Sequence, residues 1–459
     1  MTIWHPDRAH LKRPAYLSLA EQFTRAIRDG KLPSGTRLPP HRKLADDLGL
    51  SVQTVSRAYE ELARRGLVAG EIGRGSFVQP QRDEPSPPYL PERLVELIDL
   101  SILKPVCEPM HLERLKRALG WLADSLPSSS ALSFRPNMVF PRHRAVAVEW
   151  LKACGLEVAP QNVTLTNGAT AGMTTALMSV VPPGTAVATE AIGHHTLVPL
   201  ANYLGLALEG LPIDEDGLIP EALDEACRKA ELRAVFVQPS VVNPTATLMS
   251  EGRRAAIAAV ARKHDIAIIE NDVLGPLVER CAPIAAFAPE RTLYVTSFTK
   301  ITVPGLRVGY VVAPDRYAAA LANRHLVSNW MATPMVAEIA SKWVTDGTAM
   351  ELVRWQREVL ARRHRIADEL LGGAARAHEQ SLHLWLPLPE SWSEESFVAQ
   401  ARLRGVAVAP GLSFRISKEP WQPAVRISVG STTEAELRHG LGTIATLLQG
   451  DPEHLLLAI

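Results

Sequence analysis

Short apolar runs joined by helix-length connections constrain the fold of this chain more than any other feature. The runs stand at residues 163–166, 186–189, 234–238, 267–269 and 293–296, each bounded by Gly, Pro or Asn. Apolar strands joined by helices predict an α/β fold with a mainly parallel sheet covered on both faces. From about Leu352, a long charged helix pattern leads to LeuHisLeuTrpLeu and AlaValArgIleSerVal, which predict strands of a smaller α+β lobe.

A stretch rich in proline and polar residues divides the chain. Its sequence, QPQRDEPSPPYLP over residues 79–91, excludes a regular helix and favours an extended, semi-stiff spacer. We therefore expect a small domain over residues 1–79, a linker over residues 80–91 and a large domain over residues 92–459. Within the large domain we expect a large lobe over about 130–345 and a small lobe over about 346–459.

Charge is divided between the two predicted domains. Residues 1–80 hold 13 Lys and Arg against 8 Asp and Glu, a net charge of +5, and the rest holds 36 against 41, a net charge of −5. A basic block ahead of a mildly acidic body is typical of a nucleic-acid-binding domain fused to another domain. No window approaches the roughly 20 apolar residues of a membrane span, and the N-terminus has no apolar signal, so a cytoplasmic location is expected. The four cysteines are scattered without metal-ligand or disulfide-framework spacing.

Residues 44–62 carry a helix-turn-helix pattern: a short helix, a turn at Gly49 and a second helix capped by Ser51. Apolar residues recur at spacings that pack these helices against a third, expected over residues 18–29. These apolar residues are Leu44, Ala45, Leu48, Val55, Ala58, Tyr59 and Leu62. The other face of the second helix presents side chains suited to base edges and phosphates, namely Gln53, Thr54, Ser56 and Arg57. Residues 71–78 predict a Gly-rich hairpin with Arg74 at its tip.

Three segments of this region resemble the winged-helix domain of the GntR family, in order and across the whole domain. They are LeuProProHisArgLysLeuAlaAspAspLeu, ThrValSerArgAlaTyrGluGluLeu and GlyArgGlySerPheVal. The resemblance implies contacts to double-stranded DNA from Arg42, Ser51, Gln53, Thr54, Arg57, Arg74 and Gly75. The family commonly has Arg where this chain has Val52, so a base preference does not carry over. The alternative is a winged helix used for protein contacts.

The strongest chemical signal is SerPheThrLysIleThrValProGlyLeuArgValGlyTyr at residues 297–310. Lys300 ends a strand-loop segment, with a hydroxyl three residues before it and an arginine seven residues after it. A lysine amine that loses its proton in a partly desolvated site condenses reversibly with an aldehyde, so the segment suits an internal aldimine. Ser297 and Arg307 would hold a phosphate beside it, the arginine through two parallel hydrogen bonds. The alternative is a surface lysine in a loop.

Further elements of the same site follow in order. ThrAsnGlyAlaThrAlaGlyMet at 166–173 lies where a strand turns into a helix, so backbone N–H groups there can face a phosphate. These N–H groups belong to Gly168, Ala169 and Thr170. ValValAsnProThrAlaThr at 241–247 resembles the AsnProThrGly loop of aminotransferases, whose asparagine binds the phenolic oxygen of the cofactor, a role that falls on Asn243. Arg426 stands where this superfamily binds the substrate carboxylate; the alternative is a plain strand-edge arginine.

Together these motifs cover residues 160–430 in the order of the fold-type I aminotransferases. Their union with a GntR-type domain resembles the MocR subgroup of regulators. The resemblance implies a mainly parallel seven-stranded sheet in the large lobe, pyridoxal 5'-phosphate (PLP) as the cofactor at Lys300, and a homodimer whose sites are completed by the neighbouring subunit. Paired winged helices would then bind a repeated or two-fold DNA operator.

Several positions depart from an active transaminase. In residues 268–277 the family places an aspartate against the pyridine nitrogen and a tyrosine two or three residues later, and this tyrosine is absent. The partner of the nitrogen is Asn271 or Asp272, and alignment on the preceding glutamate favours Asn271. A carboxylate keeps the ring protonated, whereas an amide sustains much less charge on it, which predicts good PLP binding and poor catalysis. The usual aromatic residue on the ring is replaced by His194 or His195, of which His194 is preferred.

Three functions compete. The leading hypothesis is a transcriptional regulator that senses PLP, with an amino acid or amine as a candidate effector bound through an aldimine at Lys300. The rival is an active aminotransferase that carries a DNA-binding module, which Asn271 and the missing tyrosine disfavour. The third is a regulator whose aminotransferase-like domain no longer binds PLP. The sequence names neither the operator, the regulated genes, the direction of control nor the effector.

Overall fold

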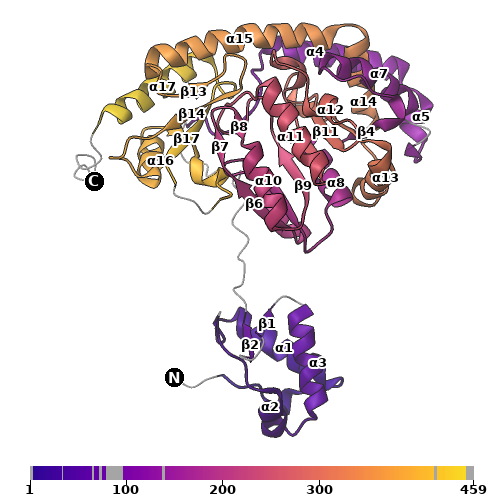
Figure 1. Cartoon of the computed structure of the whole chain (residues 1–459), viewed down its shortest axis with the longest axis vertical. Coiled ribbons are helices and arrows are strands. Elements are labelled where there is room, and N and C mark those ends of the chain that lie inside the picture. Colours follow the sequence, from indigo (N-terminus) through magenta and orange to yellow (C-terminus); the bar gives the residue numbers. More distant parts are fainter. Residues whose placement is uncertain are drawn as a thin grey trace. The chain divides into compact units, whose positions relative to one another are not determined.

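The computed structural model describes residues 4–33, 35–64, 67–71, 75–78, 97–136, 140–417 and 421–450. It divides into two compact units, Met1–Leu94 and Val95–Ile459, which are described separately (Figure 1). The predicted linker, residues 80–91, lies outside the described residues. In the described part of the chain, no helix is both long and apolar enough to cross a membrane.

Three helices and a hairpin form the N-terminal unit. A 3-10 turn (Arg8–His10) precedes α1 (Ala15–Arg28), α2 (His41–Leu48) and α3 (Val52–Arg64), and the antiparallel hairpin pairs β1 (Val68–Glu71) with β2 (Gly75–Val78). Gly49 ends α2 in the left-handed conformation at φ 60°, which glycine adopts without strain. The Ser51 hydroxyl accepts a 3.1 Å hydrogen bond from the Thr54 N–H and so caps α3. All seven apolar residues predicted to pack the helices are buried in one core, which confirms the helix-turn-helix.

A seven-stranded sheet forms the centre of the large lobe. Its order is β4-β12-β11-β10-β9-β5-β6, and every neighbouring pair is parallel except that β12 is antiparallel to both β11 and β4. The strands are β4 (Val163–Thr166), β5 (Ala186–Glu190), β6 (Ala207–Leu211), β9 (Leu232–Val237), β10 (Ala267–Asn271), β11 (Thr292–Ser297) and β12 (Gly309–Val312). A small hairpin of β7 (Ile213–Asp214) and β8 (Gly217–Leu218) follows β6. All five apolar runs of the sequence are strands of this sheet, so the predicted α/β fold is confirmed.

Helices cover both faces of the sheet. Ile269 and Val295 pack with α8 (Ala169–Val180), α9 (Leu197–Leu204) and α13 (Asp315–Asn329). On the opposite face, Ile268 packs with α10 (Pro220–Lys229), α11 (Glu251–Lys263) and α12 (Ile284–Phe287). Successive side chains of a strand point to opposite faces, so a strand covered on both sides must be apolar throughout. The remaining helices before the small lobe are α4 (Pro109–Ser125), α5 (Ser128–Leu132), α7 (Pro141–Ala153) and α14 (Pro334–Thr345).

The small lobe is built on a four-stranded antiparallel sheet in the order β13-β14-β17-β16. The two predicted strands are β14 (His383–Pro387) and β17 (Ala424–Ser428), and the others are β13 (Arg376–Ala377) and β16 (Ala409–Pro410). The long charged helix α15 (Thr348–Leu371) begins before the expected Leu352, and α16 (Glu394–Leu403) and α17 (Glu434–Gln449) complete the lobe. Strand β3 (Ile98–Asp99) pairs in parallel with β15 (Val406–Ala407). The segment that precedes the large lobe in the sequence therefore also packs on the small lobe.

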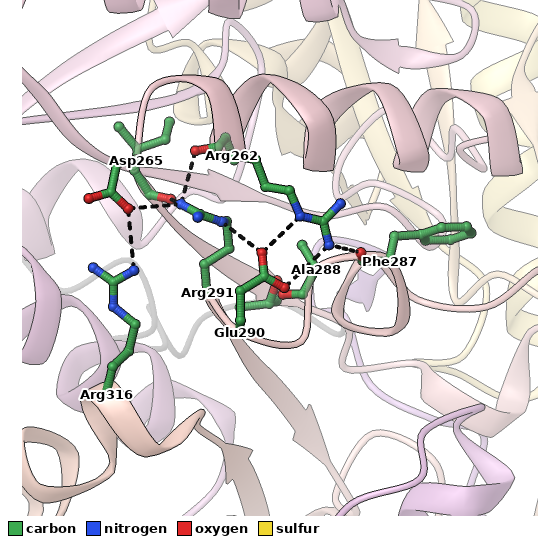
Figure 2. A network of polar contacts seen from close by, with 10 residues as sticks. Arg262, Asp265, Phe287, Ala288, Glu290, Arg291 and Arg316 are labelled. Carbon is green, nitrogen blue, oxygen red and sulfur yellow. Dashed lines mark hydrogen bonds and ion pairs between the residues drawn. The ribbon is translucent and has the colours of Figure 1, made fainter.

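An ion-pair network fixes the amino-terminal ends of β10 and β11 (Figure 2). Arg291 is buried and donates to the carbonyl oxygens of Ala261 at 3.1 Å and Ile266 at 3.2 Å, and it contacts the Asp265 carboxylate at 3.2 Å. Two further pairs are Arg262 with Glu290 at 2.9 Å and Arg316 with Asp265 at 3.3 Å. The network joins the end of α11 to the amino-terminal ends of the strands. The candidate site described next lies at their carboxyl ends.

Candidate functional site

Lys300 follows the carboxyl end of β11, beside the carboxyl end of β10. Ligands of open α/β sheets bind at the carboxyl ends of the strands. The Lys300 Nζ donates a hydrogen bond to the Leu103 carbonyl. Burial, with the charges of Arg426 and Arg307, lowers the pKa of the Lys300 amine to about 8. A substantial share of this amine is therefore neutral and nucleophilic near neutral pH.

The register of the sheet brings the predicted phosphate ligands to one place. Ser297 in β11 lies opposite Gly309 in β12, and Gly309 lies opposite Thr166 in β4. A Cβ at Gly309 would meet the Gly168 carbonyl carbon at 2.7 Å, so the strand can approach the start of α8 only with glycine there. Strands far apart in the sequence therefore align Ser297 with the turn that leads into α8.

Gly168 and Arg307 form the rest of this cradle. Gly168 is the N-cap of α8 at φ 83°, and a Cβ on it would lie 2.9 Å from Arg307 Nη2. A larger residue would therefore be strained and would also displace the guanidinium. Ala169 and Thr170 are the first residues of α8, so their N–H groups lie at the positive end of the helix. The cradle has the cation, hydroxyl and backbone donors that an anion requires.

Asn271 and Asp272 face opposite sides of the sheet. The Asp272 carboxylate accepts a 2.8 Å hydrogen bond from the Tyr294 hydroxyl and pairs with Arg280. Asn271 lies on the α8 face, because Ile269 two residues earlier packs with α8. Its amide is buried, and neither polar atom has a hydrogen-bond partner among the described residues. A buried amide of this kind is costly unless a ligand completes its hydrogen bonds, so the geometry favours Asn271 as the residue that faces a ligand.

Arg426 in β17 connects the small lobe to the same site. Its Nη1 donates to the Asn243 side-chain oxygen at 2.8 Å, and its Nη2 donates to the Ser101 carbonyl. Its charge is one of the two that lower the pKa of Lys300. The structure thus brings together three predicted residues from distant parts of the chain: Lys300, Asn243 and Arg426.

His194 lies next to these cations in the loop after β5. Its Nδ1 is 2.8 Å from the Thr196 hydroxyl oxygen, which fixes the orientation of the ring. Burial, with the charges of His195, Lys300 and Arg426, holds the pKa of His194 well below 6.5. The ring is therefore neutral at physiological pH, and the charge of Lys300 acts on it.

A strap of chain, residues 98–104, was not predicted as part of the site. Its residue Leu100 accepts a 2.7 Å hydrogen bond from the Ser428 N–H, which holds the strap on the small lobe. The strap then supplies the two carbonyl groups, of Ser101 and Leu103, that bind Arg426 and Lys300. Backbone carbonyls belong to every residue type, so no sequence motif could have indicated this role.

The predicted DNA contacts Gln53, Thr54 and Arg57 lie in α3, Ser51 is its N-cap, and Arg42 lies in α2. Arg42, Gln53 and Arg57 are exposed, and the Ser51 and Thr54 hydroxyl groups are hydrogen-bonded to each other at 2.8 Å. The Arg57 guanidinium lies 4.2 Å above the Tyr16 ring, a cation–π contact that holds the long side chain.

Ser56 was expected on the solvent face of α3, but its hydroxyl is 3.0 Å from His41 Nδ1. This residue therefore links α3 to α2.

The hairpin places one further cation near the predicted contacts. Gly75 begins β2 at φ 113° and is exposed, whereas Arg74 lies outside the described residues. Arg37 pairs with Phe77 of β2, and a Cβ on Gly75 would be 3.0 Å from its Nε. Sequence reasoning missed Arg37, although its place just before the helix-turn-helix in a basic segment was a usable signal.

Two protein families match the chain in agreement with its two units. Residues 122–444 match the family described as aminotransferase class I and II. Residues 15–78 match the family described as bacterial regulatory proteins, gntR family. The first match covers the sheet, the candidate site except the strap at residues 98–104, and most of the small lobe, and the second covers α1, α2, α3 and the hairpin.

Two curated relatives match over nearly the whole length of both chains, and a third over about three quarters of each. The chain is 28% identical to the uncharacterized HTH-type transcriptional regulator YdeF of Bacillus subtilis, over 97% of this chain and 96% of the relative. It is 24% identical to the probable rhizopine catabolism regulatory protein MocR of Rhizobium meliloti, over 94% and 93%. It is 26% identical to the pyridoxine biosynthesis transcriptional regulator PdxR of Corynebacterium glutamicum, over 77% and 78%.

Solved aminotransferase structures share the fold of the larger unit. An archaeal alanine:glyoxylate aminotransferase superposes with a TM-score of 0.70 at 22% identity, over 77% of this chain and 91% of that chain. LysN of Thermus thermophilus, an α-aminoadipate aminotransferase complexed with N-(5'-phosphopyridoxyl)-L-leucine, superposes with a TM-score of 0.69 at 20% identity, over 79% and 94%.

Proposed function

Because the chain belongs to the aminotransferase class I and II family and carries a GntR-family domain at its N-terminus, we propose that it is a DNA-binding transcriptional regulator whose larger unit binds PLP. The relatives that match both units over their length are named as a transcriptional regulator and a regulatory protein, which supports this function over that of a metabolic enzyme. An amino acid or amine that joins PLP at the site would be the second effector.

The residues of the site fit PLP by the chemistry they offer. PLP supplies an aldehyde that joins amines covalently and an electron-withdrawing pyridine ring. Lys300 offers the amine, and its pKa of about 8 keeps part of it neutral. The phosphate group would be held by Ser297, Arg307 and the first N–H groups of α8, at Gly168, Ala169 and Thr170. Asn243 would donate to the phenolic oxygen, Asn271 would face the ring nitrogen, and His194 would cover the ring.

One observation supports a regulator: Asn271, a buried side chain on the α8 face whose polar atoms have no hydrogen-bond partner among the described residues, is an amide and not a carboxylate. An Asn271 amide can hold a pyridine nitrogen but does not stabilise a positive charge on it as a carboxylate does. The family's tyrosine, expected two or three residues after the partner of the ring nitrogen, is absent from this segment, so a second group used in transamination is also missing. The rival function, an active aminotransferase, requires steady turnover of an amino donor and a 2-oxo acid despite these replacements.

An absorbance spectrum and a gel-shift assay test the proposal together. Purified protein supplied with PLP should show the visible band of covalently bound cofactor, and Lys300→Ala should lose it. Arg57→Ala should keep the band and bind the promoter DNA of its own gene more weakly at physiological salt, because a phosphate contact is lost. The absence of the band in the wild type would contradict PLP binding, and unchanged DNA binding by Arg57→Ala would contradict the assignment of α3.

We also propose that the protein acts as a homodimer. Leu132 and Val327 are 84% and 86% exposed, and two residues after the first and three after the second the exposed rings of Phe134 and Trp330 stack at 4.9 Å. Apolar groups that gather on a surface mark an interface. The patch continues to the phosphate cradle, because Asn167, next to Gly168 in the chain, accepts a 3.0 Å hydrogen bond from the Thr333 N–H. Light scattering measures the mass of the purified protein, and a monomer would contradict this assignment.

A further inference from the structure

Three aromatic rings run from the expected position of the cofactor ring to Arg426. The His194 and His195 rings stack with centroids 5.0 Å apart and an interplanar angle of 14°. The His195 ring meets the Phe414 ring edge to face at 5.6 Å. The Arg426 guanidinium lies over the Phe414 ring, 4.9 Å from its centroid. The row therefore ends on the one predicted residue that would bind a carboxylate.

Phe414 is fixed by contacts to both lobes. It ends a short 3-10 helix, Gly411–Phe414, in the small lobe and is buried. Its carbonyl accepts a 2.9 Å hydrogen bond from the Gly193 N–H of the loop that carries His194. On the other side, the Trp385 ring meets it at right angles at 6.3 Å. The backbone hydrogen bond fixes the place of Phe414 in the chain, and the His195 and Trp385 rings pack against its ring, so the ring lies in a packed place beside the guanidinium.

The charge states of His195 and Arg426 are compatible with aromatic rings that orient the Arg426 guanidinium. Burial and the charges of Arg426 and Lys300 lower the pKa of His195 to about 4, so its ring is neutral at physiological pH. A neutral histidine stacks without repelling Arg426. The guanidinium is attracted to the negative face of the Phe414 ring, a contact worth about 0.5–2 kcal/mol depending on its exposure to water.

We propose that Phe414, braced by His195, is a positioning residue that aims Arg426 at the carboxylate of an α-amino acid and so makes the site prefer amino acids to amines without a carboxylate. This inference rests on the proposed PLP-binding function and adds the chemical class of the second ligand. Phe414 itself contacts neither cofactor nor ligand in this role. Its effect is confined to ligands that engage Arg426.

The test compares two ligands that differ only in the carboxylate. Calorimetric titration of the full-length, PLP-loaded protein with L-alanine and with ethylamine gives two dissociation constants, and their ratio isolates the carboxylate. In the wild type L-alanine should bind more tightly. Phe414→Leu, which keeps an apolar side chain but removes the ring, should weaken L-alanine binding about 3- to 30-fold and leave ethylamine unchanged. Phe414→Tyr retains the ring and should retain the ratio.

A purely structural role predicts a different result. If Phe414→Leu weakens both ligands equally or neither, Phe414 does not position Arg426 and the inference is wrong. His195 is partly exposed, so His195→Ala serves as the second variant if Phe414→Leu does not fold. It should lower the same ratio about 2- to 5-fold, and an unchanged ratio would again overturn the inference. A wild-type protein that takes up no PLP would overturn the proposed function as well, whereas the variant results concern the inference alone.

Discussion

The rate at which PLP attaches to the protein should level off a little above pH 8. With its ordinary pKa of 10.5, a lysine is only about 0.1% neutral at pH 7.5, whereas the pKa of about 8 leaves roughly a quarter of Lys300 neutral. Only the neutral amine attacks an aldehyde. Between pH 7 and pH 9 the neutral fraction should rise about tenfold and then saturate, whereas an unshifted lysine would gain about 100-fold and continue to rise.

Stopped-flow absorbance after mixing PLP with cofactor-free protein measures this rate. The same buffers with Nα-acetyl-lysine amide in place of the protein give the behaviour of PLP with an ordinary amine. Arg426→Gln removes a positive charge, so the pKa of Lys300 should rise and the midpoint should move to higher pH. Arg426→Lys keeps the charge and should keep the midpoint. A wild-type rate that still climbs tenfold per pH unit above pH 9 would refute the argument.

Two further predictions concern the ring and the sheet. Asn271→Asp should raise the turnover of L-alanine with a 2-oxo acid about tenfold or more, because a charge-assisted hydrogen bond to the ring nitrogen is stronger than a neutral one. An unchanged turnover rate would mean that Asn271 does not face the ring. Arg291→Met should lower the free energy of unfolding by about 2–4 kcal/mol, because buried carbonyl groups and charges lose their partner. The Arg262 side chain is half-exposed, so Arg262→Met should lower the free energy of unfolding by less than about 1 kcal/mol. Equal midpoints of urea unfolding for the two variants would contradict this account of the network.

The sequence was sufficient to predict features that depend on residues close together in the chain. Gly49 and Ser51 mark the turn and the cap of the second helix, and apolar runs bounded by Gly, Pro or Asn mark the strands, because each depends on near neighbours in the chain. Residues near Lys300 were found in the same way, from their spacing and from the family resemblance. The partners of Lys300 and Arg426 could not be found, because Leu103 and Ser101 are 197 and 325 residues away and contribute only backbone atoms.

Phe414 could not be recognised from the sequence for a different reason. Its ring is one of many apolar side chains, and its role comes from the 4.9 Å approach to Arg426, which depends on how the 3-10 helix Gly411–Phe414 packs against β17. The choice between Asn271 and Asp272 also needed coordinates. Adjacent residues at a strand end differ only in the face to which they point, and Tyr294 and Arg280 reveal which face holds Asp272.

The strap also has a consequence for how ligands would enter the site. It begins a few residues after the predicted linker, residues 80–91, and its carbonyl groups bind the same two cations that a cofactor and a carboxylate would bind. A cofactor at Lys300 and a carboxylate at Arg426 would compete with the hydrogen bonds to Leu103 and Ser101. The proposed ligands would therefore rearrange backbone contacts of the strap as well as side chains.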